Sequence, residues 1–312
     1  MVTTALAGRA AVRRGAVRRR SEAAVGVLLL APSLLIIFGV VLYPAAFAGY
    51  LSVLNLHIGR PGVAFVGLQN YVRLLSLPEF WRSVGRGLVW TAGSLGPQVV
   101  LGLALASLLN YPGLRARVLY RGLVTLPWLV PTVTVAIIWR WMFHDVYGVI
   151  NAVLMGLGIT DHPIPWLADP DLAMAAVIVA NVWRGLPLMV VLFLAALQSI
   201  PRDLYDAAEM DGASPWQRYL RVILPQLAPV VWIAAVLRTI WTFNFFDLPW
   251  IMTHGGPGEA TTIPPVYAYL VTFSGYRLSE GAAVTVVMFA ILVVFALLYF
   301  RLSPEDEHAP AR

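Results

Sequence analysis

The chain has 312 residues, of which 59% are hydrophobic and only 12% are charged, whereas soluble domains carry about twice that charged fraction. It contains no cysteine and no lysine, which excludes disulfides, thiolate metal sites, Schiff-base chemistry and a GxxxxGK[ST] phosphate-binding loop. The net charge of +6 would be compatible with a protein that binds nucleic acid. Because the arginines flank apolar runs, we interpret them as a topology signal and expect no nucleic-acid partner.

Six apolar runs reach the roughly 20 residues that a helix needs to cross a bilayer. In chain order they are Ala23–Leu42, Leu88–Leu109, Val118–Phe143, Leu172–Leu197, Gln226–Met252 and Gly281–Phe300. Pro127 and Pro131 predict that the third span is tilted or broken. Lipid admits only helices or closed barrels, and the alternation typical of barrel strands is missing. We therefore predict an all-α polytopic membrane protein with about six transmembrane helices.

The arginines predict which side of the membrane each loop faces. They gather before the first span and after the second, fourth and sixth, as Arg9, Arg13, Arg14, Arg18, Arg19, Arg20, Arg115, Arg117, Arg121, Arg202, Arg218, Arg221 and Arg301. The opposite loops carry fewer, so we expect both termini in the cytoplasm. The expected parts are a basic cytoplasmic tail (1–22), a transmembrane domain (23–301) and a cytoplasmic tail (302–312). The segment Ala46–Ala48 resembles a signal-peptidase site, but the first span is longer than the apolar core of such a signal.

The segment Leu204–Pro225 lies between two spans, yet it is charged and carries helix-end signals. Gly212 suits the left-handed conformation that ends a helix. Ser214 and Gln217 match a capping box around Pro215, and Pro225 is expected to stop the second helix. These signals predict a cytoplasmic helix–turn–helix within residues 200–225. On physical grounds alone, an amphipathic helix pair resting on lipid headgroups is the favoured interpretation of this segment.

Several motifs resemble those of one family. The run Asp206-Ala207-Ala208-x-x-Asp211-Gly212-Ala213, followed by Tyr219, Val222, Leu224 and Pro225, resembles the EAA loop of ABC-importer permeases. Asp206 and Tyr219 stand where that family usually has glutamate and phenylalanine. Further stretches resemble carbohydrate permeases of the maltose and glycerol-phosphate type: Leu42–Pro44, Val66–Tyr71, Asn181–Gly185, and Thr253–Pro257 with Thr261 and Thr262.

This resemblance implies the permease subunit of an ATP-driven, binding-protein-dependent importer for a sugar or related polar solute, in a prokaryotic cell membrane. It implies no enzymatic activity and no cofactor in this chain. The expected partners are a second permease subunit, a cytoplasmic ATPase dimer, an external solute-binding protein and the lipid bilayer. The EAA-like loop would dock on the ATPase as a coupling helix through Asp206, Ala207, Ala208, Asp211, Gly212, Ala213, Tyr219, Leu224 and Pro225.

Two arginines fall near the middle of apolar spans, where an ionised side chain is a functional hypothesis by default. Arg184 lies in the fourth span and Arg238 in the fifth. Helical spacing places Asn181, Arg184, Gly185 and Leu188 on one face, and Arg238, Trp241, Thr242 and Phe245 on another. We predict that these eight residues line the substrate path, and that Asp247 turns away from it at about 100° per residue. The resemblance implies sugar contacts at six of the eight, all except the two arginines.

Other interpretations stay open at this stage. The two arginines would suit an anionic solute such as glycerol phosphate or an acidic sugar, or would merely hold the bundle together. An ion-coupled secondary transporter would need an intramembrane acidic cluster, and an enzyme would need reactive groups in a pocket. His144, Asp145, Asp161 and His162 are too scattered to predict a metal site.

Overall fold

The computed structural model describes residues 27, 29–59, 61–111 and 113–302, so the expected tails, including the arginines at 9–20, lie outside the described residues or at their edge. Within these ranges five helices are long and apolar enough to span a membrane, and one bent pair of helices makes a sixth candidate. This confirms the prediction of a helical membrane protein with about six spans. The five are Leu29–Ser52, Pro78–Asn110, Pro170–Ser199, Pro215–Phe243 and Leu278–Arg301.

The first span extends well beyond its predicted end. It extends through η1 (Ile37–Leu42) and α2 (Tyr43–Ser52), ten residues beyond the predicted end at Leu42. Pro44 does not end the helix, because it follows a π-helical turn whose shifted hydrogen bonds absorb the missing N–H. The span therefore ends only where the chain turns back at Val53.

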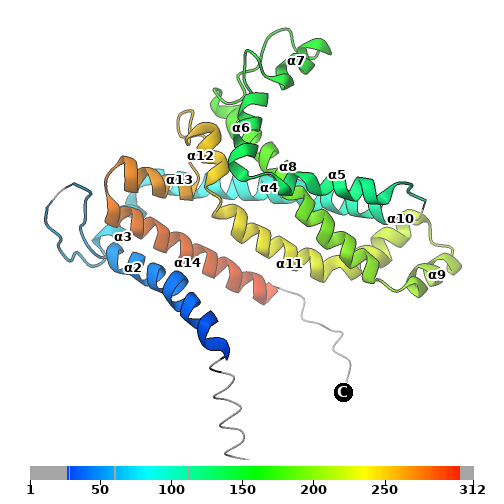
Figure 1. Cartoon of the computed structure of the whole chain (residues 1–312), viewed down its shortest axis with the longest axis horizontal. Helices are drawn as coiled ribbons and strands as arrows, with labels where there is room; N and C mark the ends of the chain where they lie inside the picture. The colour runs from blue at the N-terminus through cyan, green and yellow to red at the C-terminus, as the bar shows by residue number, and fades with distance from the viewer. Residues whose placement is uncertain (1–26, 28, 60, 112, 303–312) are drawn as a thin grey trace, which may run out of the picture.

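The bent pair forms the third span. α5 (Arg117–Leu129) and α6 (Thr132–Met142) meet at 96°. Val130 has extended backbone angles because it precedes Pro131, and that proline begins α6. The predicted break is confirmed, but it falls at Pro131, whereas Pro127 stays inside α5. Figure 1 shows α6 rising away from the bundle and carrying the short helix α7 (Val149–Gly156).

The centre of the bundle is formed by α4 (Pro78–Asn110), α8 (Pro170–Ser199) and α11 (Leu224–Phe243), all in mutual contact. α5 covers α8, while α14 (Leu278–Leu302) packs against α2 and α3 (Gln69–Ser76). Small residues allow α4 and α8 to approach closely, since a Cβ on Gly102 would lie 2.8 Å from the Cβ of Met189. The membrane interior favours such small residues between helices.

Two of the motifs that carry the family resemblance, Val66–Tyr71 and Thr253–Pro257 with Thr261 and Thr262, form hydrogen bonds that stabilise the fold. The Asn70 side-chain amide donates to the carbonyls of Ser52 and Leu54, both at 2.7 Å, and so holds α3 to the end of the first span. In the turn after α12 (Asp247–Thr253), the hydroxyls of Thr253 and Thr261 lie 2.5 Å apart, and Thr262 donates to the carbonyl of Gly255 at 2.8 Å. The glycine-rich stretch is thus a tightly bonded turn that leads to α13 (Pro264–Tyr269).

Two predictions about the fifth span are wrong. The helix that starts as α10 (Pro215–Arg218) does not stop at Pro225, but continues through the π-helical η2 (Tyr219–Ile223) into α11. Pro225 lies in the first turn after η2, a position that tolerates a missing N–H. The span also ends at Phe243 rather than at Met252, and the residues beyond the break form α12.

Gly102→Ala tests the packing of α4 on α8. The added methyl group would lie 3.2 Å from the Phe193 ring as well as 2.8 Å from Met189, and overpacking of this kind destabilises by about 1–3 kcal/mol. We expect a lower melting temperature for the purified protein in detergent. The control is Gly96→Ala in the same helix, where no atom lies within 4 Å, so that variant should keep or raise the melting temperature. Equal melting temperatures would contradict the proposed packing.

Candidate functional site

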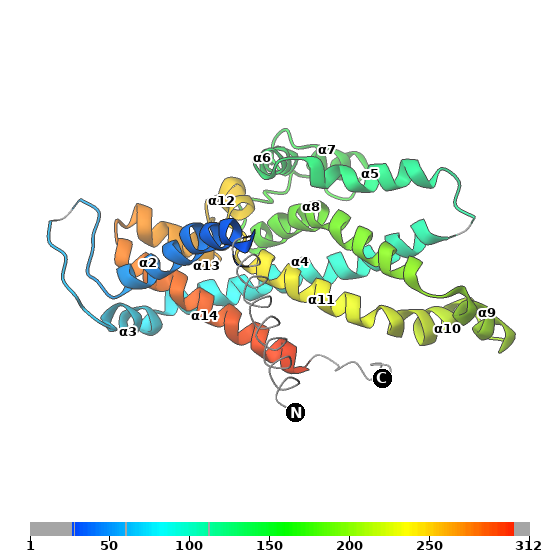
Figure 2. The same cartoon turned by 60° about the horizontal axis from the view of Figure 1, so that its bottom comes forward.

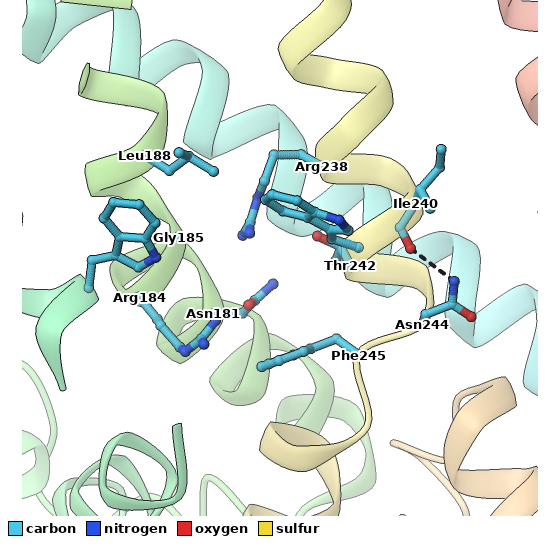
Figure 3. Close-up of a pocket in the computed structure, with 11 residues that line it drawn as sticks. Asn181, Arg184, Gly185, Leu188, Arg238, Ile240, Thr242, Asn244 and Phe245 are labelled. Carbon is cyan, nitrogen blue, oxygen red and sulfur yellow. Dashed lines mark hydrogen bonds between the residues drawn. The ribbon is translucent and has the colours of Figure 1, made fainter. Parts of the chain in front are cut away.

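The central bundle contains a cavity of about 450 Å³ that is lined mainly by α8 and α11 (Figure 3). All eight residues predicted to face the path line it: Asn181, Arg184, Gly185, Leu188, Arg238, Trp241, Thr242 and Phe245. Three further residues complete the wall: Trp128, Ile240 and Asn244. The structure therefore brings the predicted residues together. The volume of the cavity falls in the range of small-molecule sites.

Arg238 is the most deeply buried charge at the cavity, with 7% of its surface exposed. Its Nε donates to the Oε1 of Gln98 on α4 at 3.0 Å, and the Nε2 of Gln98 donates to the backbone carbonyl of Asn181 on α8 at 2.9 Å. Gln98 itself is fully buried. One amide thus connects all three central helices, because it accepts from α11 and donates to α8.

Arg184 approaches from the opposite wall of the cavity (Figure 3). Its Nη2 donates to the hydroxyl of Thr132 at the start of α6 at 2.7 Å, and its guanidinium lies 4.8 Å from the centre of the Phe245 ring. A cation over an aromatic face at this distance is attracted to it. Phe245 lies in the break after α11, so this contact also positions the segment that leads to α12.

Gly185 supplies the space that the buried guanidinium occupies. A Cβ at this position would collide with Nη2 of Arg238 and with Nε2 of Gln98. Glycine is therefore required by close approach rather than by its backbone angles. The Asn181–Gly185 motif of the sequence is explained by this geometry, because both of its ends form the wall around Arg238.

Several polar atoms at the cavity are buried without a partner among the described residues. They are Nδ2 of Asn181, Nε of Arg184, Nη2 of Arg238 and Oγ1 of Thr242. Buried polar groups normally have hydrogen-bond partners, so these atoms have unused hydrogen-bonding capacity at the cavity wall. Aromatic surfaces lie beside them, since Trp128, Trp241 and Phe245 share the wall. The arrangement suits a hydroxylated ligand that stacks on rings and accepts hydrogen bonds.

The sequence interpretation missed Gln98, Thr132 and Trp128. Gln98 had a usable signal, since a lone amide in an apolar span is rare and tends to face the bundle interior. Asp247 does lie outside the cavity wall as expected, but the reason given for it was wrong. α11 ends at Phe243, so the rotation per residue of a continuous helix does not apply to Asp247.

The segment 200–225 forms the predicted helix–turn–helix at the end of the bundle farthest from α3 (Figure 2). α9 (Arg202–Met210) is followed by Asp211 and then by Gly212, whose φ of +72° is the expected left-handed conformation. The amide of Ser214 donates to Gln217 Oε1 at 2.9 Å, and the Gln217 amide donates to Ser214 Oγ at 3.3 Å. Both capping signals are therefore confirmed.

The residues predicted to contact an ATPase fall into three groups. Ala208 is buried, and the Tyr219 hydroxyl accepts a hydrogen bond from Ser107 of α4 at 3.1 Å, so both help to hold the segment against the bundle. The exposed members are Asp206, Ala207, Asp211, Gly212 and Pro225. Ala213 and Leu224 are half-buried. The exposed group is the part that a partner can reach.

These features define a class: a multi-pass helical membrane protein with a polar cavity in its bundle, as a solute transporter requires. The chain belongs to the family of inner membrane components of binding-protein-dependent transport systems, whose model matches residues 98–305. It is accordingly the permease component of an ABC importer, and ATP hydrolysis belongs to a separate subunit.

Relatives and a solved structure agree with this assignment. The chain is 37% identical to the trehalose/maltose transport system permease protein MalF of Thermococcus litoralis, over 90% of this chain and 94% of that protein. It is 36% identical to the sulfoquinovosyl glycerol transport system permease protein SmoG of Agrobacterium fabrum, over 88% and 89%. Its fold matches that of a bacterial alginate ABC transporter, which was solved in complex with an alginate pentasaccharide-bound periplasmic protein. The TM-score is 0.75 at 21% identity, and the match covers 91% of this chain and 95% of that chain.

Gly185→Ala tests the buried arrangement independently of transport. The new methyl group would displace the Arg238 guanidinium, which we expect to destabilise the protein by about 1–3 kcal/mol. Arg238→Ala removes one of the two obstacles and leaves Gln98, so the loss of melting temperature caused by Gly185→Ala should shrink in that background without vanishing. A double-mutant cycle in detergent measures the coupling. Additive effects, within about 0.5 kcal/mol, would show that the two side chains do not compete for this space.

Proposed function

We propose that the chain carries a sugar or a related polar solute through the cavity between α8 and α11. The observation that supports this most is the set of unpartnered donors beside Trp128, Trp241 and Phe245. Stacking rings and converging donors match the faces and hydroxyls of a carbohydrate. Relatives named for trehalose and maltose, and for sulfoquinovosyl glycerol, support the same substrate class.

The complete importer would contain further chains. A second permease, an ATPase dimer and an external solute-binding protein are the partners that we propose, and the alginate transporter solved with its periplasmic protein supports the last of these. We propose both termini and residues 200–225 on the cytoplasmic side, from the distribution of arginines. Residues 23–301 would then form the transmembrane domain between the tails 1–22 and 302–312.

Reconstituted uptake tests the transport role. Proteoliposomes that contain the whole importer should accumulate solute only with ATP inside and the solute-binding protein outside. Trp241→Ala, which removes a stacking surface from the cavity wall, should lower uptake about tenfold, the effect of about 1.4 kcal/mol. Trp81→Ala is the control, because Trp81 is similarly exposed (52% against 55%) but does not line the cavity. Equal uptake by both variants would argue against this path, and uptake without ATP would argue against the importer.

The exposed part of segment 200–225 is the proposed contact with the ATPase. It exposes Asp206 and Ala207 on α9 and the turn at Gly212. An ion pair of 2.6 Å between Arg218 and Glu209 joins the two helices. Two helices that are joined by an ion pair and that expose small residues are suited to docking in a groove of the ATPase. Because the ATPase is cytoplasmic, its binding here also requires the proposed orientation.

Gly212→Val should detach or uncouple the ATPase while the permease still reaches the membrane. Gly212 has a positive φ, which a β-branched residue strongly disfavours, so the turn between α9 and α10 should change shape. Asp206→Ala should act in the same direction more mildly. Gly158→Val is a matched control, since Gly158 also has a positive φ (+69°) and open surroundings but lies in the connection after α7. Normal ATPase co-purification and uptake in both Gly212→Val and Asp206→Ala would refute the docking role.

A further inference from the structure

The cavity carries positive charge that the described residues do not neutralise. Arg184 and Arg238 both line it, and its wall contains no aspartate or glutamate. Among the described residues neither arginine takes part in an ion pair, and the partners that they do have, Thr132 and Gln98, are neutral. Asp247 acts on Arg184 only through space. Charge held without a counter-ion in the membrane interior is costly.

The free donors belong to these same side chains. Nη2 of the buried Arg238 and Nε of Arg184 have no partner among the described residues, and neither does Nδ2 of Asn181. Figure 3 shows the three side chains directed toward the space between α8 and α11. Each arginine donates through one nitrogen to the bundle and has a second nitrogen without a partner in the described part of the chain.

We infer that the cavity selects a solute with an anionic substituent, namely a sugar or polyol that bears a carboxylate, sulfonate or phosphate group. This inference rests on the proposed transport function and narrows its substrate class. The anionic oxygens would accept from Arg238 and Arg184, because guanidinium groups match the geometry of such oxyanions. The ring or chain of the solute would lie against Trp241 and Trp128, and Gly185 leaves room for the Arg238 guanidinium at the cavity wall.

Binding to the assembled transporter in nanodiscs, without the solute-binding protein, measures this selectivity directly. Equilibrium dialysis would compare three matched pairs: glucose with glucuronate, galactose with galacturonate, and glycerol with glycerol 3-phosphate. Within a pair the solutes differ chiefly by the charged group. We expect at least one anionic member to bind about tenfold or more tightly than its neutral partner, as hydrogen bonds to charged groups allow.

Arg238→Gln and Arg184→Gln should each reduce that preference about tenfold. Arg184 is only half-buried, so its variant keeps the test valid if Arg238→Gln does not fold. Arg82→Gln is the control, because Arg82 is exposed and bonded to Glu79 outside the cavity. A preference in none of the three pairs, or one that survives both cavity variants, would overturn the inference. ATP-driven uptake of a neutral sugar would then leave the proposed function standing, whereas uptake of no solute would reject both.

Discussion

The central bundle depends on how one buried cation is accommodated. Arg238 of α11 lies where lipid offers no hydrogen bonds, and Gln98 of α4 accepts from it while donating to the backbone of α8. Because an unpaired polar group in this environment is costly, the three helices are fixed relative to one another by these two bonds. Gly185 makes this arrangement possible, because any side chain at that position would occupy the space of the Arg238 guanidinium.

Local rules were sufficient for the features that depend on neighbouring residues. Apolar length identified the spans, Pro131 identified the break in the third span, and the capping residues at Gly212 and Ser214 identified the turn. Helical spacing also placed Arg184 and Arg238 on the faces that meet at the cavity. Each of these signals acts within about two turns of helix, a distance over which sequence and backbone geometry are directly linked.

Features set by contacts distant in sequence were not predictable in this way. Gln98 lies 140 residues from Arg238, and nothing local indicates which helix supplies the acceptor. Trp128 reaches the cavity only because α5, which precedes the 96° bend, packs against α8. Pro225 misled the interpretation for a related reason: a π-helical turn and packing against α4 and α8 outweigh the local tendency of proline to end a helix.

The continuity of the helix through Pro225 matters for mechanism, because it joins two predicted helices into one. Pro215–Phe243 contains 29 residues, and at ~1.5 Å per residue it is about 43 Å long. One end joins α9 through the Arg218–Glu209 ion pair, and the other carries Arg238, Trp241 and Thr242 of the cavity wall. The exposed turn and the cavity are therefore ends of a single element, with no flexible loop between them. Under the proposed docking, a shift of the turn would move the cavity wall directly, while Gln98 on α4 would resist it.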